Sequence, residues 1–137
     1  MSDSDSIPPL APAIPGFVWA YRFRPGEASC TPLPTDALPS DLGGNEGFLW
    51  LHLNLADMRV TSFLERLPDL PSEVIAALTT HDTHAALTLD EQSIYGTLVD
   101  FQRDFDHDTR DIGWLHFFVS ETIIITTRLQ PLRSVDR

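Results

Sequence analysis

The sequence contains no lysine and only one cysteine, and each shortage removes a class of function. All nine positive charges are arginines, so neither a P-loop lysine nor a Schiff-base lysine is available. Cys30 cannot form a disulfide within the chain or a CxxC zinc or redox site. We interpret it as a bystander, because no histidine or arginine near it in sequence is placed to activate a thiolate. A GxSxG motif is also absent, so the sequence indicates that the chain is not an enzyme.

Long apolar runs and an excess of positive charge are missing as well. The longest apolar stretches, such as 114–119 and 123–125, are far shorter than the roughly 20 residues that a membrane-spanning helix needs. The acidic N-terminus lacks the basic start and apolar stretch of a secretory signal. A formal net charge of −11 disfavours nucleic acid and anionic membranes, whereas cations or basic proteins are tolerated as partners. We therefore expect a soluble cytosolic domain.

The chain is long enough for one domain, with 137 residues of which 42% are hydrophobic. Residues 1–15 hold four prolines among small residues and are predicted to be a disordered leader. Residues 16–130 are predicted to form the folded domain. Its first strand is indicated by aromatic residues at alternate positions, all expected on one buried face: Phe17, Trp19, Tyr21 and Phe23.

The rest of the domain combines further strands with two helices. Residues 48–53 are almost continuously apolar, which is typical of an interior strand. Asp57 is predicted to cap a helix whose apolar stripe is Val60, Phe63, Leu64 and Leu67, and a second helix is predicted to start near Pro71. Strands are predicted over 85–89, 93–103, 113–120 and 122–127. The predicted fold class is α/β (α+β), a mixed and largely antiparallel sheet with helices packed on it in α/β/α layers.

Histidine and aspartate form two local clusters that could hold a metal. His81, Asp82 and His84 offer two imidazoles and a carboxylate within four residues, and these groups suit zinc. The alternative is a solvated helix end, because histidines three apart share a face only if the segment is helical.

A second cluster, Asp104, Asp106 and Asp108, has the spacing of the first three ligands of a calcium loop. The loop pattern then fails, because Thr109 stands at the glycine position and Leu115 at the position of the final glutamate. A polar hairpin turn with weak attraction for divalent cations is the remaining interpretation. His52 and His116, each alone in an apolar strand, are interpreted as core or contact residues rather than ligands.

Three stretches, taken in order, resemble the N-terminal cytoplasmic domain of the CorA-type divalent-cation transporters, in particular their ZntB-like zinc transporter branch. Residues 47–57 are similar to the family's strand that runs Trp-aliphatic-His-Leu-Asp and caps the next helix, with Asn54 in place of the usual aspartate. Residues 67–71 are similar to the start of its second helical element, and 118–135 to its final hairpin and entry to a stalk helix. Related sequences tend to carry arginine and proline where this chain has His84 and Ala85.

The resemblance implies a regulatory and vestibule domain of a transporter for zinc or another divalent metal ion. It implies a homopentamer, a place at the cytoplasmic face of the cell membrane, and attachment only through later membrane helices. Residues 131–137 would then begin the stalk helix, and a divalent cation such as zinc or magnesium would bind weakly. Two alternatives stay open: an acidic adaptor that binds a basic protein, and a hydrolase whose aspartates and histidines converge only in three dimensions.

Overall fold

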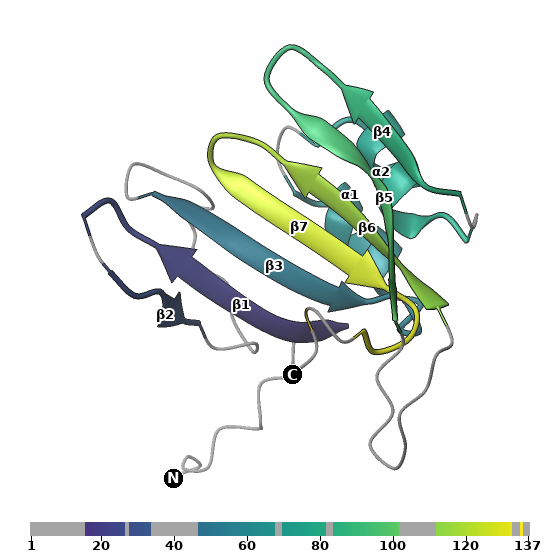
Figure 1. Ribbon diagram of the computed structural model, residues 1–137, viewed down its shortest axis with the longest axis horizontal. Coiled ribbons are helices and arrows are strands. Elements are labelled where there is room, and N and C mark those ends of the chain that lie inside the picture. The colour runs from purple at the N-terminus through teal and green to yellow at the C-terminus, as the bar shows by residue number, and fades with distance from the viewer. Residues whose placement is uncertain are drawn as a thin grey trace, which may run out of the picture.

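The structure is a computed structural model that describes residues 16–26, 28–33, 47–67, 70–81, 84–101, 112–132 and 135. Its elements in chain order are β1 (Phe17–Phe23), β2 (Thr31–Pro32), β3 (Phe48–Asn54), α1 (Val60–Glu65), α2 (Ser72–Thr79), β4 (Ala86–Leu89), β5 (Ile94–Phe101), β6 (Ile112–Val119) and β7 (Ile123–Arg128). The strands form a seven-stranded sheet in the order β2-β1-β3-β7-β6-β5-β4 (Figure 1). Only β3 and β7 pair in parallel, and the other neighbours are antiparallel. The predicted mixed, largely antiparallel α+β fold is confirmed.

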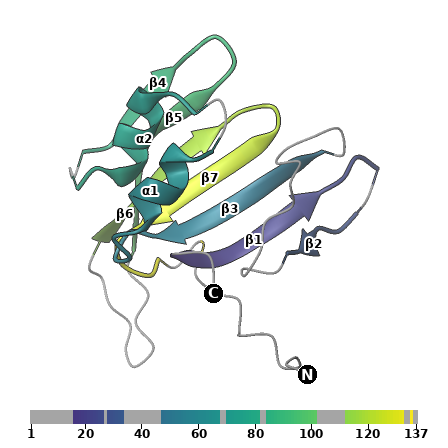
Figure 2. The ribbon, with the colours of Figure 1, turned by 180° about the vertical axis from the view of Figure 1, so that it is seen from behind.

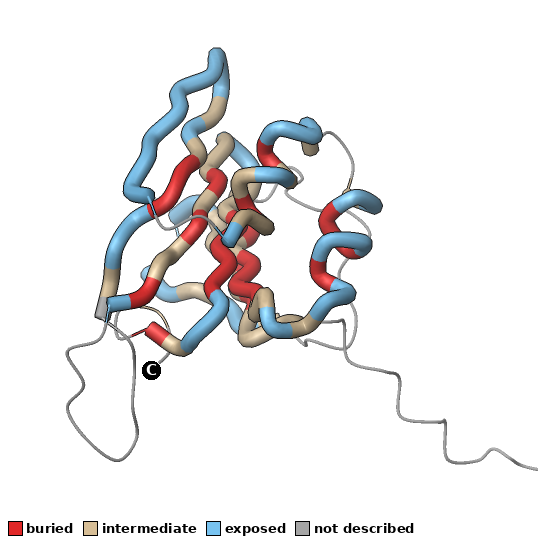
Figure 3. The backbone as a smooth tube through the Cα atoms, turned by 90° about the vertical axis from the view of Figure 1, so that its right-hand side faces the viewer, coloured by how far each residue is buried: buried red, intermediate tan, exposed pale blue. Residues whose placement is uncertain are grey.

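Both helices cover the same face of the sheet (Figures 1 and 2). Three leucines of the central strand β3, Leu49, Leu51 and Leu53, are completely buried against them, and burial of such side chains drives folding. The buried helix residues are Val60, Phe63 and Leu64 of α1 and Val74 and Leu78 of α2, and Figure 3 shows the buried segments of the two layers. Among the described residues, the helices therefore form one layer on one face of the sheet. The predicted α/β/α arrangement has a second helical layer, which these residues do not supply.

The opposite face of the sheet, which we call the open face, is also apolar. In-register residues on five neighbouring strands form one row across it: Trp50, Ile124, Val119, Ile94 and Leu89. At the β1–β3 end aromatic rings cover one another, with centroids 5.0 Å apart for Trp19 and Trp50 and 4.7 Å apart for Phe23 and Phe48. At the β4–β5 end the side chains of Leu87, Leu89, Ile94 and Leu98 are exposed. We call these four residues the apolar edge.

The first strand corrects the prediction that its four aromatic residues share one buried face, because all four are only half-buried and one of them lies on the other face. Trp19 and Tyr21 lie on the open face with Phe23, because they pair with His52, Trp50 and Phe48 of β3. Phe17 points to the helical layer instead, where its ring contacts Phe63 of α1 at 5.3 Å. A register shift between Phe17 and Trp19 adds one residue to the strand, and such an addition reverses the side-chain alternation.

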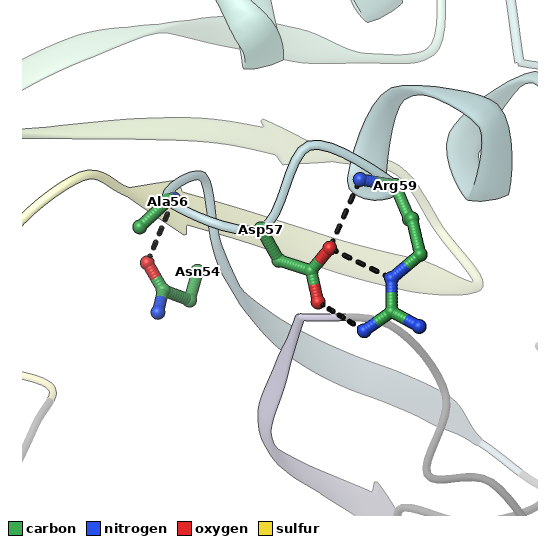
Figure 4. A network of polar contacts seen from close by, with 4 residues as sticks. All are labelled: Asn54, Ala56, Asp57 and Arg59. Carbon is green, nitrogen blue, oxygen red and sulfur yellow. Dashed lines mark hydrogen bonds and ion pairs between the residues drawn. The ribbon is translucent and has the colours of Figure 1, made fainter.

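Two Asx turns, one at Asn54 and one at Asp57, stabilise the loop from β3 to α1 (Figure 4). Asn54 Oδ1 accepts a hydrogen bond from the Ala56 backbone N–H at 2.9 Å, and Asp57 Oδ1 accepts one from the Arg59 backbone N–H at 3.0 Å. These turns use the side chain in place of a backbone carbonyl. The residue at the N-cap of α1 is Arg59, so the prediction of Asp57 at that position was wrong, although Asp57 organises the turn that leads into the helix.

The chain after β7 returns toward β1. Leu132 is completely buried, and Trp19 Nε1 donates a hydrogen bond to the Val135 carbonyl at 3.1 Å. Within the described part of the chain, no helix has the length and apolar character needed to cross a membrane.

Candidate functional site

A row of buried polar side chains crosses the sheet beneath the C-terminal end of α2. Thr97 of β5 pairs with His116 of β6, and His116 pairs with Thr127 of β7. Their relative exposures are 5%, 4% and 0%, so each polar atom needs a partner inside the protein. The Thr97 hydroxyl meets that need for His116, with Oγ1 2.7 Å from Nδ1.

The end of α2 is fixed to the same row. The Thr127 hydroxyl donates a hydrogen bond to the Leu78 carbonyl, one of the last-turn carbonyls that have no partner within a helix. The helix ends at Thr79, and Thr80 takes an extended backbone conformation (φ −68°, ψ 148°). His81 therefore follows directly after a helix end that is tied to β7.

His81 and His116 line one pocket of about 230 Å³. Its remaining lining comes from Thr80, Ile112, Trp114, Leu129 and Gln130. Ligand sites commonly combine apolar walls with a few polar groups, and this pocket has that composition. Imidazole nitrogen binds zinc, copper, nickel and iron, whereas magnesium and calcium prefer oxygen.

The second buried histidine has a different environment, on the open face. His52 is completely buried, its Nδ1 lies 2.7 Å from Thr126 Oγ1, and its ring centroid lies 5.0 Å from that of Trp19. Trp50 Nε1 donates to the same threonine oxygen at 3.0 Å. These contacts link β1, β3 and β7, so His52 serves packing, in agreement with its interpretation as a core residue.

A larger pocket, of about 350 Å³, lies at the other end of the β6–β7 hairpin. Its lining includes Leu67, Phe118 and Ile125, and among the described residues that line it Glu121 is the only titratable one. Among these described residues, a single carboxylate with apolar and neutral polar groups does not define a reaction or a metal site.

The structure separates the residues that the sequence grouped as metal ligands. His81 and His84 are both exposed, and of the two only His81 borders the pocket of about 230 Å³. Asp82, Asp104, Asp106 and Asp108 lie outside the described residues. Among the residues that the structure describes, no three histidine, cysteine, aspartate or glutamate side chains gather as a metal site.

Sequence reasoning missed the proximity of His116 to His81. They are 35 residues apart in the sequence and share only the lining of one pocket, and a histidine within an apolar strand is usually a core residue. One signal was present, because alternation along 113–120 places Trp114, His116 and Phe118 on one side of the strand, the side that also faces α2 in the structure.

Solved structures share this fold, and two of them illustrate the likeness. The cytoplasmic domain of ZntB from Vibrio parahaemolyticus matches with a TM-score of 0.69 at 16% sequence identity, over 88% of this chain and 47% of that one. The full-length CmaX protein matches with a TM-score of 0.71 at 22% identity, over 88% of this chain and 37% of that one. This chain thus spans less than half the length of either protein. At these identities the likeness establishes the fold.

The family follows from the sequence match. The model of the family described as CorA-like Mg2+ transporter protein matches residues 45–137, a range that runs from just before β3 to the last residue and exceeds half of the chain. The chain belongs to this CorA-like transporter family, which confirms the resemblance seen in its motifs. No curated protein matches the chain.

Proposed function

We propose that this chain is the cytoplasmic domain of a CorA-type transporter for zinc or another divalent cation, where it lines the vestibule and regulates flux. The observation that carries the proposal is the family match over residues 45–137. The fold shared with a ZntB cytoplasmic domain supports it, and so does the net charge of −11, because an acidic surface raises the local concentration of cations. The whole protein would be a homopentamer attached to the membrane through segments outside this chain.

The proposal includes weak binding of divalent cations by the domain itself. The residues proposed to take part are His81, Asp82, His84, Asp104, Asp106 and Asp108. Because they are spread over two stretches of chain, they would share hydrated ions rather than enclose one in a complete first shell.

The test is ion flux through the whole protein. The full-length polypeptide, purified and reconstituted in liposomes loaded with an ion-sensitive dye, is expected to admit Zn²⁺, Ni²⁺ or Mg²⁺ faster than protein-free liposomes. The coding sequence is expected to continue past Arg137 with two apolar segments of about 20 residues.

Two results would contradict the transporter proposal. One is a coding sequence that lacks both apolar segments, and the other is a reconstituted protein that passes none of the three ions. Either result would favour the acidic adaptor, which would then be tested by the binding of a polyarginine peptide to the chain.

A further inference from the structure

We propose that the edge strand β4 pairs in antiparallel fashion with β4 of a second copy of this chain, so that two sheets join into one. The inference goes beyond the proposed function and does not depend on it. It starts from the strand order, because β4 is the last of the described strands in the sheet (Figure 1). An edge strand offers backbone N–H and C=O groups on its outer side to another strand.

The sequence of β4 leaves this edge open to pairing. Proteins usually protect an edge strand with a charged residue, a proline or a bulge. Strand β4 reads Ala-Leu-Thr-Leu and pairs with β5 without a shift in register, so it has none of the three. Every residue from 84 to 92 is exposed. At the opposite edge of the sheet, β2 has only two residues, and one is Pro32, which has no backbone N–H to donate.

The pattern of side chains on β4 indicates a second copy as the partner. Leu87-Thr88-Leu89 reads the same in both directions. When two antiparallel copies align with Thr88 opposite Thr88, each Leu87 lies opposite Leu89 of the other copy. Directly opposite residues share a face of the sheet, so the apolar edges of both copies merge on the open face. A slip of one residue would put leucine opposite threonine and separate the two apolar edges, and the hydrophobic pattern therefore sets this register.

The charges at the two ends of β4 fit the same arrangement. Asp90 and Glu91 directly follow the strand, whereas His84, which can carry a positive charge, stands shortly before it. Antiparallel pairing brings the acidic end of each copy to the histidine end of the other and keeps the two acidic pairs apart. The net charge of −11 still repels the second copy at longer range, and salt screens that repulsion. The pairing is therefore expected at high salt, as a closed two-fold contact.

Disulfide trapping of the 137-residue chain in 500 mM NaCl tests the register. Thr88→Cys is made together with Cys30→Ser, so that the introduced thiol is the only one in the chain. Directly opposite residues have Cα atoms about 4.5–5.5 Å apart, a separation that a disulfide spans. Ala86→Cys in the same background is the matched control, because it is also exposed and in β4, but its two copies would lie roughly 14 Å apart.

Diamide then oxidises paired thiols to a disulfide. We expect Thr88→Cys to yield about tenfold more covalent dimer than Ala86→Cys, because only the first pair of thiols lies within reach. Equal yields from the two variants would overturn the inference, since they would show random collision rather than a fixed register.

A lysine at the centre of the contact tests the pairing without a cross-link. Thr88→Lys places two like charges directly opposite each other, which destabilises a strand pair. It also makes the net charge less negative, so long-range repulsion alone would predict more association rather than less. Thr61→Lys is the matched control, because it makes the same change at an exposed position of α1.

Sedimentation velocity in 500 mM NaCl compares the two lysine variants, with circular dichroism to show that both fold. We expect Thr88→Lys to be monomeric and Thr61→Lys to associate as the wild type does. A dimer that is undiminished in Thr88→Lys, or lost equally in Thr61→Lys, would overturn the inference. Flux in liposomes is measured separately, and the five-fold ring proposed for the whole protein is a different contact, so failure of either proposal leaves the other standing.

Discussion

The two buried histidines are each satisfied by the same kind of partner. Each has a threonine Oγ1 at 2.7 Å from its Nδ1, Thr126 for His52 and Thr97 for His116. A buried imidazole without such a partner would lose the hydrogen bonds that it makes in water. Their surroundings differ, because the ring of Trp19 lies 5.0 Å from that of His52, whereas His116 borders the pocket of about 230 Å³.

Asp57 gives a prediction for acid pH. Hydrogen bonds from the Arg59 side chain hold the pKa of Asp57 at about 2, below its usual 3.8. Because the folded-state pKa is lowered, the ionised carboxylate stabilises the fold fully above about pH 4, and this contribution is lost as the pH falls toward 2. Asp57→Asn keeps an acceptor for the Arg59 backbone N–H but removes the charge. The wild type is therefore expected to be more stable than the variant at pH 5.5, with the difference shrinking toward pH 2.

Urea unfolding at pH 5.5, 4, 3 and 2 measures that difference. Arg59→Met is the companion variant, because it removes the guanidinium that bonds to Asp57 Oδ1 and Oδ2 at 3.0 and 2.8 Å, and it should show the same loss of pH dependence relative to wild type. The contact is exposed and screened by solvent, so the effect should be small. A difference between wild type and Asp57→Asn that is constant from pH 5.5 to 2 would contradict the assignment.

At the scale of elements, the junction between β1 and β3 depends on Gly47. Its φ is +92°, and a Cβ there would lie 1.8 Å from the Phe23 carbonyl oxygen, at the point where Phe23 pairs with Phe48. Gly26 also has a positive φ, of +79°, but a Cβ there would meet no atom within 4 Å. Gly47→Ala therefore adds a backbone clash to the conformational cost, whereas Gly26→Ala carries the conformational cost alone.

We expect Gly26→Ala to lower the free energy of unfolding by about 1 kcal/mol and Gly47→Ala by about 3 kcal/mol or more. Chemical denaturation of both variants under the same conditions measures the two values. Equal losses would mean that β1 and β3 can separate at this end without cost, and the contact between their ends would then contribute nothing to stability.

Local patterns predicted most elements, because apolar residues on the buried side recur about every two residues in a strand and about every 3.6 residues in a helix. The six predicted strands match β1 and β3 to β7 within a few residues, and the stripe that contains Val60, Phe63 and Leu64 is the buried side of α1. Strand β2 was missed because it has only two residues, Thr31 and Pro32. The parallel pairing of β3 with β7 joins residues about 75 apart, and no local pattern encodes a partner at that distance.

Of the two histidines that border the smaller pocket, the sequence singled out only His81, because local patterns do not show which distant residues come together. His81 was found as one of two neighbouring histidines, because sequence proximity is visible in the chain. His116 reaches the pocket through its strand, and its position opposite the end of α2 depends on how the helix packs on β5, β6 and β7. Spacing along the sequence grouped His81 with His84, and of these two exposed residues only His81 borders the pocket.

At the scale of the whole molecule, an apolar surface and a large negative charge oppose each other. The apolar edge exposes 63% of Leu87, 70% of Leu89, 39% of Ile94 and 51% of Leu98, enough to favour association with another apolar surface. The net charge of −11 repels a second copy, and this repulsion acts over about 10 Å at 0.1 M salt and about 3 Å at 1 M. Self-association of the domain should thus be weak at low salt and should increase as salt screens the charge.

Sedimentation velocity of the 137-residue chain in 20 mM and 500 mM NaCl tests this balance. We expect a monomer at low salt and a mixture of monomer and larger species at high salt, because screening leaves the apolar contact unopposed. Leu87→Ser combined with Leu89→Ser should restore the monomer at high salt with little effect on stability, since both side chains are mostly exposed. Met58→Ser is the matched control: Met58 is 92% exposed but lies in the loop before α1, so its removal should not alter association. A discrete pentamer at low salt, or association that persists in the double variant, would show that another surface of the domain carries the contact.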